Sequence, residues 1–253
     1  MVKVIMHGYL GKMGRVICGM NTKEIEVVAG VDALPAHTPM PFPTYMNIRD
    51  CDMPADVIID FSTAVAVPGL INYAVAKKIP VVVCTTGLTQ ETLAAMQSAA
   101  AHVAVFKSAN MSLGINFIAS VISRAAGLMR DSGFDMEIIE KHHNQKIDAP
   151  SGTALLLADA LNEALDGQLE YVFDRSTTAT KRKSNELGLH AIRGGNIVGE
   201  HTVLFAGADE VIEFTHIAQS KEVFAVGAVK AANFLKGKTP GMYSMQDVMD
   251  NVR

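Results

Sequence analysis

The chain has 253 residues, of which 49% are hydrophobic and 19% charged, and its net charge is −4. This composition predicts a folded protein with one large domain or two modest ones, and it argues against disorder. The weakly negative charge excludes bulk attraction to nucleic acid or anionic lipid, so any anionic ligand must be captured by local cations.

Up to about Phe106, short β-branched apolar runs alternate with helical segments. We expect strands at Val4–His7, Ile25–Val31, Val57–Phe61, Val81–Cys84 and Val103–Phe106, and helices at Lys12–Met20, Pro68–Lys77 and Thr89–Ala101. Near-continuous apolar strands with helices between them are typical of a parallel sheet that is covered on both faces. This part of the chain is predicted to be a doubly wound α/β fold of the Rossmann type.

Glycines follow the first predicted strand in the segment Gly8-Tyr9-Leu10-Gly11-Lys12-Met13-Gly14. Glycines at such a junction allow a sharp turn, close approach of the backbone to a pyrophosphate, and tight packing of the next helix. The spacing is Gly-x-x-Gly-x-x-Gly instead of Gly-x-Gly-x-x-Gly, so a tight turn without a ligand is the alternative to a dinucleotide-binding loop.

The end of the second strand favours dinucleotide binding. Asp32 stands eighteen residues after Gly14, close to the separation of about 20 at which an acidic residue accepts ribose hydroxyls. The carboxylate of Asp32 would repel a 2′-phosphate, Ala33 offers no cation to compensate, and Lys12 is the only cation expected nearby. We therefore expect NADH to be preferred over NADPH.

Two later junctions also lie at the carboxyl ends of predicted strands, where open α/β sheets bind ligands. They are Cys84-Thr85-Thr86-Gly87 and Ser108-Ala109-Asn110-Met111. We expect both to contact the cofactor, and helix-capping loops are the alternative. We do not expect Cys84 to be a nucleophile, because no base flanks it.

After Asn110 the pattern changes. Helices are expected at Ser112–Met129, Thr153–Leu165 and Phe224–Leu235, and strands at Met136–Lys141, Leu187–Arg193, Thr202–Phe205 and Glu210–Ile217. Strands with few helices between them predict a second sheet that is mixed or antiparallel. The Met/Asp-rich tail is expected to be helical. Thr177–Lys183 is expected to be an exposed loop, with Lys181-Arg182-Lys183 as a solvated basic run.

The segment Glu140-Lys141-His142-His143-Asn144-Gln145-Lys146-Ile147-Asp148-Ala149-Pro150-Ser151-Gly152-Thr153-Ala154 concentrates polar chemistry. His142, His143 and Lys146 repel one another unless they are solvated or face an anion. Ser151 is a plausible N-cap, and the helix that it opens presents backbone N–H groups to anions. The segment therefore predicts a site that holds and protonates a small acid. A solvated loop beside a capped helix is the alternative.

Other features exclude further classes of protein. No segment is apolar over enough length to span a bilayer, and Val2–Met6 does not have the character of a secretory signal, so we expect a cytoplasmic protein. Three scattered cysteines do not make a disulfide framework, and adjacent histidines without a further spaced ligand do not make a zinc site. We expect no metal. Five single histidines are interpreted as structural: His7, His37, His102, His190 and His216.

The fifteen-residue segment closely resembles the signature of the dihydrodipicolinate reductase family of the lysine and diaminopimelate pathway. The likeness covers nearly the whole chain, including Gly8–Gly14, Asp60–Ser62, Cys84–Gly87, Ser108–Asn116 and Arg193–His201. The resemblance implies an oxidoreductase that uses NADH or NADPH. It further implies a dinucleotide-binding domain at 1–111 and 221–253, and a central domain at 112–220 that binds substrate and joins a homotetramer through its sheet.

The resemblance also implies roles for individual residues. His142 and Lys146 match the proton-donor positions of the family, and His143, Gly152 and Thr153 match its substrate-binding positions. One carboxylate of the substrate would lie at the helix N-terminus that Ser151 opens. The implied reaction delivers a hydride to C4 of a conjugated cyclic imine, formed by loss of water from the hydroxylated substrate. Protonation at C3 follows, and whether His142 or Lys146 donates the proton is open.

The chain departs from the family pattern at two places. Asp32-Ala33 stands where an acidic-basic pair is expected, and Lys221 stands where some members have an arginine, which binds carboxylates in a bidentate manner. Two alternatives are kept. One is a dehydrogenase of the semialdehyde or homoserine type, which would need a different catalytic constellation. The other is a dinucleotide sensor without catalysis, which would not need His142, His143 and Lys146 together.

Overall fold

The computed structural model describes residues 1–176 and 179–251. The chain forms two compact units. The first unit comprises Met1–Ser112 and the chain from Lys221 onward, and the second comprises Leu113–Ser220. Of the predicted loop Thr177–Lys183, residues 177 and 178 lie outside the described residues. Among those that are described, no helix is long and apolar enough to cross a membrane.

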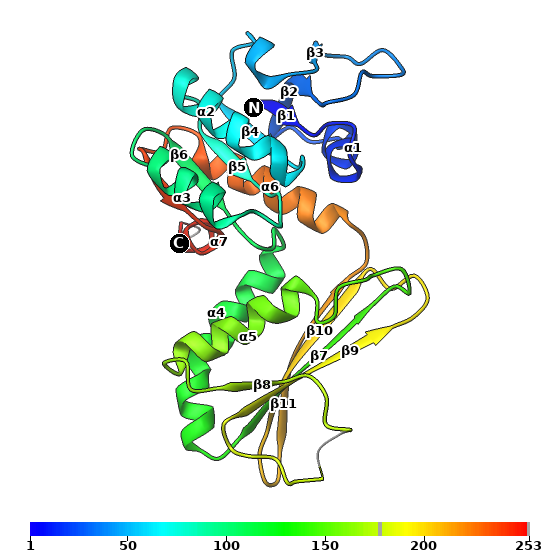
Figure 1. The fold of residues 1–253 in the computed structure, drawn as a ribbon, viewed down its shortest axis with the longest axis vertical. Helices are drawn as coiled ribbons and strands as arrows, with labels where there is room; N and C mark the ends of the chain where they lie inside the picture. Colours follow the sequence, from blue (N-terminus) through cyan, green and yellow to red (C-terminus); the bar gives the residue numbers. More distant parts are fainter. Residues whose placement is uncertain (177–178, 252–253) are drawn as a thin grey trace. The chain divides into compact units, whose positions relative to one another are not determined.

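The first unit is built around one parallel sheet (Figure 1). In sheet order its strands are β12 (Gly241–Tyr243), β6 (Ala104–Lys107), β5 (Val81–Val83), β4 (Val57–Asp60), β1 (Val2–His7), β2 (Ile25–Val31) and β3 (Thr44–Tyr45). Its helices are α1 (Lys12–Gly19), α2 (Val67–Lys77), α3 (Gln90–Ala99), α6 (Glu222–Leu235) and α7 (Met245–Asp250). Helices α2 and α3 contact each other, as do α1 and α6. The predicted doubly wound α/β fold is confirmed.

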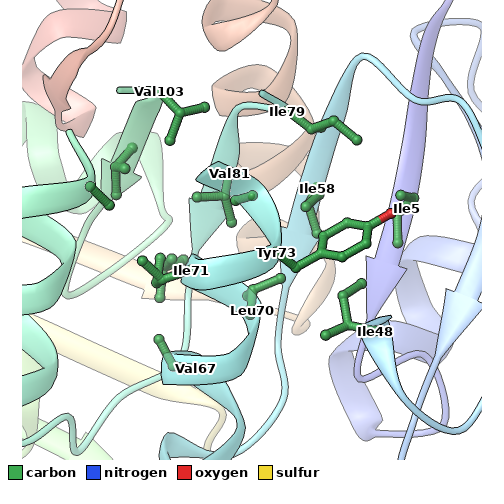
Figure 2. Close-up of a cluster of buried hydrophobic side chains, with 14 of the residues drawn as sticks. Ile5, Ile48, Ile58, Val67, Leu70, Ile71, Tyr73, Ile79, Val81 and Val103 are labelled. Atoms are coloured by element: carbon green, nitrogen blue, oxygen red, sulfur yellow. The ribbon is translucent and has the colours of Figure 1, made fainter. Parts of the chain in front are cut away.

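Continuous apolar strands give this unit its core. Figure 2 shows Leu70 and Tyr73 of α2 lying beside Ile58 of β4 and Ile48. The ring of Tyr73 is buried, and its hydroxyl donates to the carbonyl oxygen of Cys51 at 2.8 Å, so its one polar atom is satisfied. Burying a side chain of this size stabilises the fold by roughly 1.5–3 kcal/mol. This packing fixes the carboxyl ends of β1, β4 and β5, where the candidate cofactor residues begin.

The second unit has a mixed sheet, as predicted. In sheet order its strands are β11 (Val211–Ala218), β10 (Gly199–Ala206), β7 (Asp135–His142), β9 (Glu186–Arg193) and β8 (Glu170–Val172). Strand β10 runs antiparallel to β7 and β11, and β9 runs parallel to β7 and β8. Helices α4 (Leu113–Asp131) and α5 (Gly152–Ala164) contact each other and share a core with the sheet (Figure 1).

The expected elements differ from the structure mainly where strands are short. Strands β3, β8 and β12 have two or three residues each, which is too short for a readable alternation of apolar and polar positions. The tail was expected to be helical, and this is only partly right. Gly241–Tyr243 pairs with β6 as a parallel edge strand before α7 begins.

The expectation of a solvated basic run is wrong for Arg182. Its guanidinium donates to Asp135 Oδ1 at 2.6 Å and to Glu137 Oε1 at 2.9 Å, at the start of β7. Its side chain is only 18% exposed. The carboxylates that bind Arg182 lie more than forty positions earlier in the chain, so local charge patterning could not reveal them.

Candidate functional site

The loop after β1 needs glycine at two positions, because the backbone packs closely around them. Gly8 has φ +83°, and a Cβ atom there would lie 2.5 Å from the carbonyl oxygen of Phe61. A Cβ atom on Gly14 would lie 2.2 Å from the carbonyl oxygen of Gly8. Only glycine fits at either position, since real Cβ contacts are longer. Helix α1 begins at Lys12 with Gly11 as an N-cap that has no side-chain hydrogen bond.

The loop and Asp32 come together around one cavity of about 370 Å³. Asp32 Oδ2 accepts the N–H of Leu10 at 3.2 Å, and Oδ1 accepts the N–H of Leu34 at 3.3 Å. The cavity is lined by His7, Gly8, Leu10, Gly11, Asp32, Ala33, Leu34, Phe61, Ser62, Thr63 and Ala66. An acidic side chain beside a glycine loop fits the ribose and pyrophosphate of a dinucleotide. The side chain of Tyr9 is buried and packs edge-to-face on Phe42, with ring centroids 6.1 Å apart.

The expectation that Lys12 is the only cation near Asp32 is wrong, and Lys12 itself does not line the cavity. Arg49 lines a second cavity of about 380 Å³ together with His7, Asp32 and Ala33. Strand β3 pairs with the end of β2 and so brings the turn at Asn47–Asp50 close to Asp32. The short pairing that places Arg49 there was not predicted, which explains why this cation was missed.

A buried carboxylate joins the ends of β1, β4 and β5. Asp60 is fully buried and accepts hydrogen bonds from Ser62 and from Thr85 Oγ1, the latter at 2.7 Å. His7 Nδ1 lies 2.7 Å from Asp60 Oδ1. His7 was interpreted as structural, yet it also lines both cavities. Burial raises the pKa of Cys84 well above its usual value, and Asp60 adds to the effect, as expected for an unreactive thiol.

The other predicted cofactor residues form a second group at the end of β6. Ser108 Oγ donates to the carbonyl oxygen of Asn110 at 2.7 Å, and Asn110 Oδ1 accepts the N–H of Ser112 at 2.7 Å. Met111 is buried. Thr86 and Ala109 are exposed at their strand ends. Neither this group nor Cys84–Thr86 lines the two cavities beside Asp32, so their contact with a cofactor stays a prediction.

In the second unit, Glu140 is the centre of the candidate substrate site. This carboxylate is fully buried at the end of β7. Arg193 of β9 donates to both of its oxygens, at 2.7 and 2.8 Å, and the N–H of Ser151 donates at 3.0 Å. His142 Nδ1 lies 2.5 Å from Glu140 Oε2. Burial alone would raise the pKa of Glu140, but the hydrogen bonds from Arg193 and His142 outweigh it and hold that pKa below its usual value.

The histidines of this site form a compact group with Ser151. The rings of His142 and His201 meet edge-to-face with centroids 5.1 Å apart, and His201 Nε2 lies 3.0 Å from Ser151 Oγ. Ser151 is the N-cap of α5, as predicted, because its Oγ accepts the N–H of Ala154 at 3.1 Å. Burial lowers the pKa of His142 below its usual 6.5.

The clustered cations of the segment are balanced partly by carboxylates of the same segment. Lys146 Nζ lies 2.8 Å from Asp148 Oδ1, and its hydrogen bond lowers the pKa of Asp148. With Glu140 beside His142, two of the three predicted cations already face an anion. His143 is half-buried, and Gly152 is exposed at the start of α5. Glu140 and Asp148 therefore reduce the mutual repulsion that His142, His143 and Lys146 would otherwise have.

Buried His201 gives a pH-dependent contribution to stability. Burial lowers the pKa of His201 to about 3, with a smaller effect from His142. In the unfolded chain a histidine takes up a proton near pH 6.5, so stability is present above that pH and is lost as the pH falls toward 3, by about 1.4 kcal/mol per unit. Between pH 6.5 and pH 5, the free energy of unfolding measured in urea should fall by about 2 kcal/mol more for the unchanged chain than for His201→Ala. The same pH dependence of the free energy of unfolding in both chains would contradict this. His102→Ala, at an exposed histidine, is the control and should behave like the unchanged chain.

Sequence reasoning missed Arg193 and His201 as members of this site. Strand pairing brings them together, since Arg193 pairs with His142 across β9 and β7, and His201 pairs with Glu140 across β10 and β7. The alternation of side chains along β7 was the available signal, because Glu140 and His142 are two positions apart and so share a face. Lys221 is exposed and is the N-cap of α6. Across residues 1–176 and 179–251, no group of three or more His, Cys, Asp or Glu residues could hold a metal ion.

Comparisons with known proteins agree on one family. Residues 2–111 match the model "Dihydrodipicolinate reductase, N-terminus", and residues 114–249 match "Dihydrodipicolinate reductase, C-terminus". The chain is 51% identical to a 4-hydroxy-tetrahydrodipicolinate reductase from Caldanaerobacter subterraneus subsp. tengcongensis, with 98% of each chain covered. It is 48% identical to the enzyme of that name from Clostridium tetani, with 99% of this chain and 98% of the relative covered.

A solved structure shares the fold. It is a dipicolinate-bound dihydrodipicolinate reductase from Paenisporosarcina sp. TG-14, with a TM-score of 0.77 and 23% sequence identity. The match covers 96% of this chain and 97% of that chain. Two family models that together span both units, and relatives near 50% identity over nearly the full length, lead to one conclusion. The chain belongs to the dihydrodipicolinate reductase family.

Proposed function

We propose that this chain reduces 4-hydroxy-tetrahydrodipicolinate, by way of dihydrodipicolinate, to tetrahydrodipicolinate in lysine and diaminopimelate biosynthesis. One observation carries the proposal: His142, bonded to the buried Glu140, lies in one segment with Lys146 and the start of α5. A proton donor and binding groups for a dicarboxylate are thus combined in the second unit. The first unit carries the glycine loop and Asp32 around one cavity, and these groups suit the ribose and pyrophosphate of a nicotinamide dinucleotide.

When bound, the nicotinamide supplies a hydride to C4 of the ring. The residues of this chain would hold the substrate and supply the proton at C3. Lys146 and the first N–H groups of α5 are suited to carboxylates, because cations and helix N-termini attract anions. We propose His142 as the proton donor, with Lys146 as carboxylate clamp and second candidate acid. A bound dicarboxylate would favour the protonated imidazole and so offset the effect of burial on the pKa of His142.

Steady-state kinetics on the authentic substrate tests this function. The substrate is generated from aspartate semialdehyde and pyruvate by a coupling enzyme, and loss of NADH or NADPH absorbance is followed. Consumption that requires both precursors supports the proposal. Consumption with the semialdehyde alone would indicate a semialdehyde or homoserine type of dehydrogenase instead. No consumption with either cofactor would favour a dinucleotide sensor.

We further propose that the enzyme prefers NADH, and that Arg49 contributes to its weaker binding of NADPH. The Asp32 carboxylate accepts ribose hydroxyls and repels a 2′-phosphate, whereas Arg49 beside it can bind that phosphate. Arg49→Ala should lower kcat/KM for NADPH about tenfold more than for NADH, since a hydrogen bond to a charged group contributes about 1.5–3 kcal/mol. Lys12→Ala tests the other candidate cation in parallel. A several-fold higher kcat/KM with NADPH in the unchanged chain would contradict the preference.

We also propose a homotetramer that is formed through the second sheet. Exposed apolar side chains lie on its strands, including Ile192 on β9 and Val211 and Ile217 on β11, which are 47%, 57% and 58% exposed. Apolar side chains on the open face of a sheet are typical of an interface between copies. Sedimentation equilibrium should give a mass near four chains, and a monomer mass at micromolar concentration would contradict the proposal.

A further inference from the structure

The contacts of Glu140 exceed what its own burial requires. A buried carboxylate needs a positive partner and hydrogen-bond donors. Arg193 supplies a bidentate pair at 2.7 and 2.8 Å, and the Ser151 N–H adds a third donor at 3.0 Å. These three contacts are sufficient to stabilise the buried carboxylate of Glu140 without a contribution from His142. The additional 2.5 Å contact to His142 Nδ1 therefore calls for a second role.

We propose that Glu140 is a positioning residue, an inference that rests on the proposed function. Arg193 holds Glu140, and Glu140 fixes the tautomer and the ring orientation of His142 so that Nε2 delivers the proton. A carboxylate that Arg193 keeps ionised can only accept hydrogen bonds. His142 Nδ1 must then carry a hydrogen, so the proton that is gained and lost in turnover is at Nε2. Glu140 itself need not touch the substrate.

The surroundings of Nε2 agree with this orientation. A Cβ atom on Gly199 would lie 3.1 Å from His142 Nε2, so the absence of a side chain at that position leaves room beside this nitrogen. The side chain of His142 is 10% exposed, whereas that of Glu140 is 1% exposed. Nδ1 is thus directed into the unit, and the ring retains limited access to solvent.

Charged and titratable groups face His142 from several elements. They are Glu140 on β7, Arg193 on β9, His201 on β10 and Lys146 in the segment before α5. Asp148 pairs with Lys146, and His216 on β11 pairs with His201. Among these groups, Glu140 favours the protonated imidazole of His142 by direct hydrogen bonding. The charges of Lys146 and Arg193 disfavour the protonated imidazole, and His201 is neutral above its pKa of about 3. Removing the charge of Glu140 should therefore change the pH dependence of turnover as well as its rate.

Glu140→Gln tests the inference, because it preserves shape while removing charge. Arg193 is expected to take the amide oxygen, which turns the NH₂ group toward His142 Nδ1 and favours the wrong tautomer. We expect kcat at pH 7 to fall at least ~100-fold, as loss of a correctly oriented acid should, with less than about a threefold change in KM for the substrate. The pH above which kcat declines should move down by about one unit or more, because the imidazolium loses its carboxylate partner.

Glu137→Gln is the matched control. Glu137 lies on the same strand and also binds a histidine and an arginine, with Oε2 2.8 Å from His190 Nε2 and Oε1 2.9 Å from Arg182 Nε. It lies three positions before Glu140, on the other face of β7. We expect its kcat and pH profile to match those of the unchanged chain, even where its stability is lower. A purely structural role for Glu140 would give the two variants the same behaviour.

The outcomes separate the inference from the function on which it rests. If the unchanged chain turns over the authentic substrate and Glu140→Gln keeps the same kcat and pH profile, the positioning role is overturned and the function stands. If the unchanged chain gives no turnover, the proposed function fails. Should Glu140→Gln not fold, ¹⁵N NMR of the unchanged chain decides. Neutral His142 protonated at Nδ1 supports the inference, and protonation at Nε2 overturns it.

Discussion

Lys146→Ala is expected to lower kcat at least ~100-fold on the authentic substrate, and so is His142→Ala, since each removes a candidate acid of the proposed substrate site. Lys146 also holds a carboxylate under the proposed assignment, so its loss should raise KM as well. His142→Ala should leave KM nearer its original value and remove the decline of kcat as the pH rises. The difference between the two pH profiles identifies the proton donor.

Lys141→Ala is the control for this pair. Lys141 belongs to the same segment, but its Nζ lies 2.8 Å from Glu200 Oε2, and along β7 its side chain alternates with those of Glu140 and His142. Its removal costs one partly exposed ion pair, which contributes about 0–1 kcal/mol, and kcat should stay within about twofold. Unchanged turnover in both His142→Ala and Lys146→Ala would reject the assignment of the site.

Gly227→Ala should have the largest effect on stability. Gly227 is buried in α6, and a Cβ atom there would lie 1.7 Å from the carbonyl oxygen and 2.7 Å from the carbonyl carbon of Met111. Both are backbone atoms, so either α6 or the segment Ser108–Met111 must move. We expect a loss of about 2 kcal/mol or more in the free energy of unfolding, in the range of overpacked cores. Dinucleotide binding should weaken too, because the predicted cofactor residue Met111 is displaced.

Urea unfolding followed by circular dichroism measures this loss, and Gly69→Ala is the matched control. Gly69 is a helical glycine of α2 in the same unit, and a Cβ atom there would meet nothing within 4 Å. Alanine should be neutral or stabilising at this position by up to about 1 kcal/mol, as helix propensity predicts. Equal unfolding midpoints for the two variants would show that the close approach of α6 to Met111 is not needed.

The sequence allowed prediction of those elements that are long enough to show a pattern. The apolar runs of β4 and β5 were readable because a strand buried on both faces is continuously apolar. Strands β3, β8 and β12 were not, since their two or three residues carry no period and, unlike those of β5, do not form a buried apolar run. The same limit hid Arg49, which β3 places beside Asp32. Tertiary pairing, and not local propensity, determined these positions.

The candidate substrate site was predictable in its position and less so in its internal chemistry. The segment from Glu140 to Ala154 identified His142, Lys146 and the start of α5. Its internal contacts depend on Arg193, which is 53 positions from Glu140 in the chain, and on His201, which is 50 positions from Ser151. Contacts at such separations depend on the order of the strands in the sheet. The sequence pattern predicted a mixed or antiparallel sheet but not its strand order.

The first unit is assembled from two separate stretches of chain. Its edge strand β12 pairs with β6, and α6, which buries Ala225, Ala228 and Leu235, contacts β1, β4, β5 and β6. During synthesis the second unit is contiguous and can complete its sheet as it leaves the ribosome. The first unit must wait with a face of its sheet uncovered until α6 emerges. A nascent chain that stalls within the second unit would therefore leave apolar strands of the first unit exposed and open to aggregation.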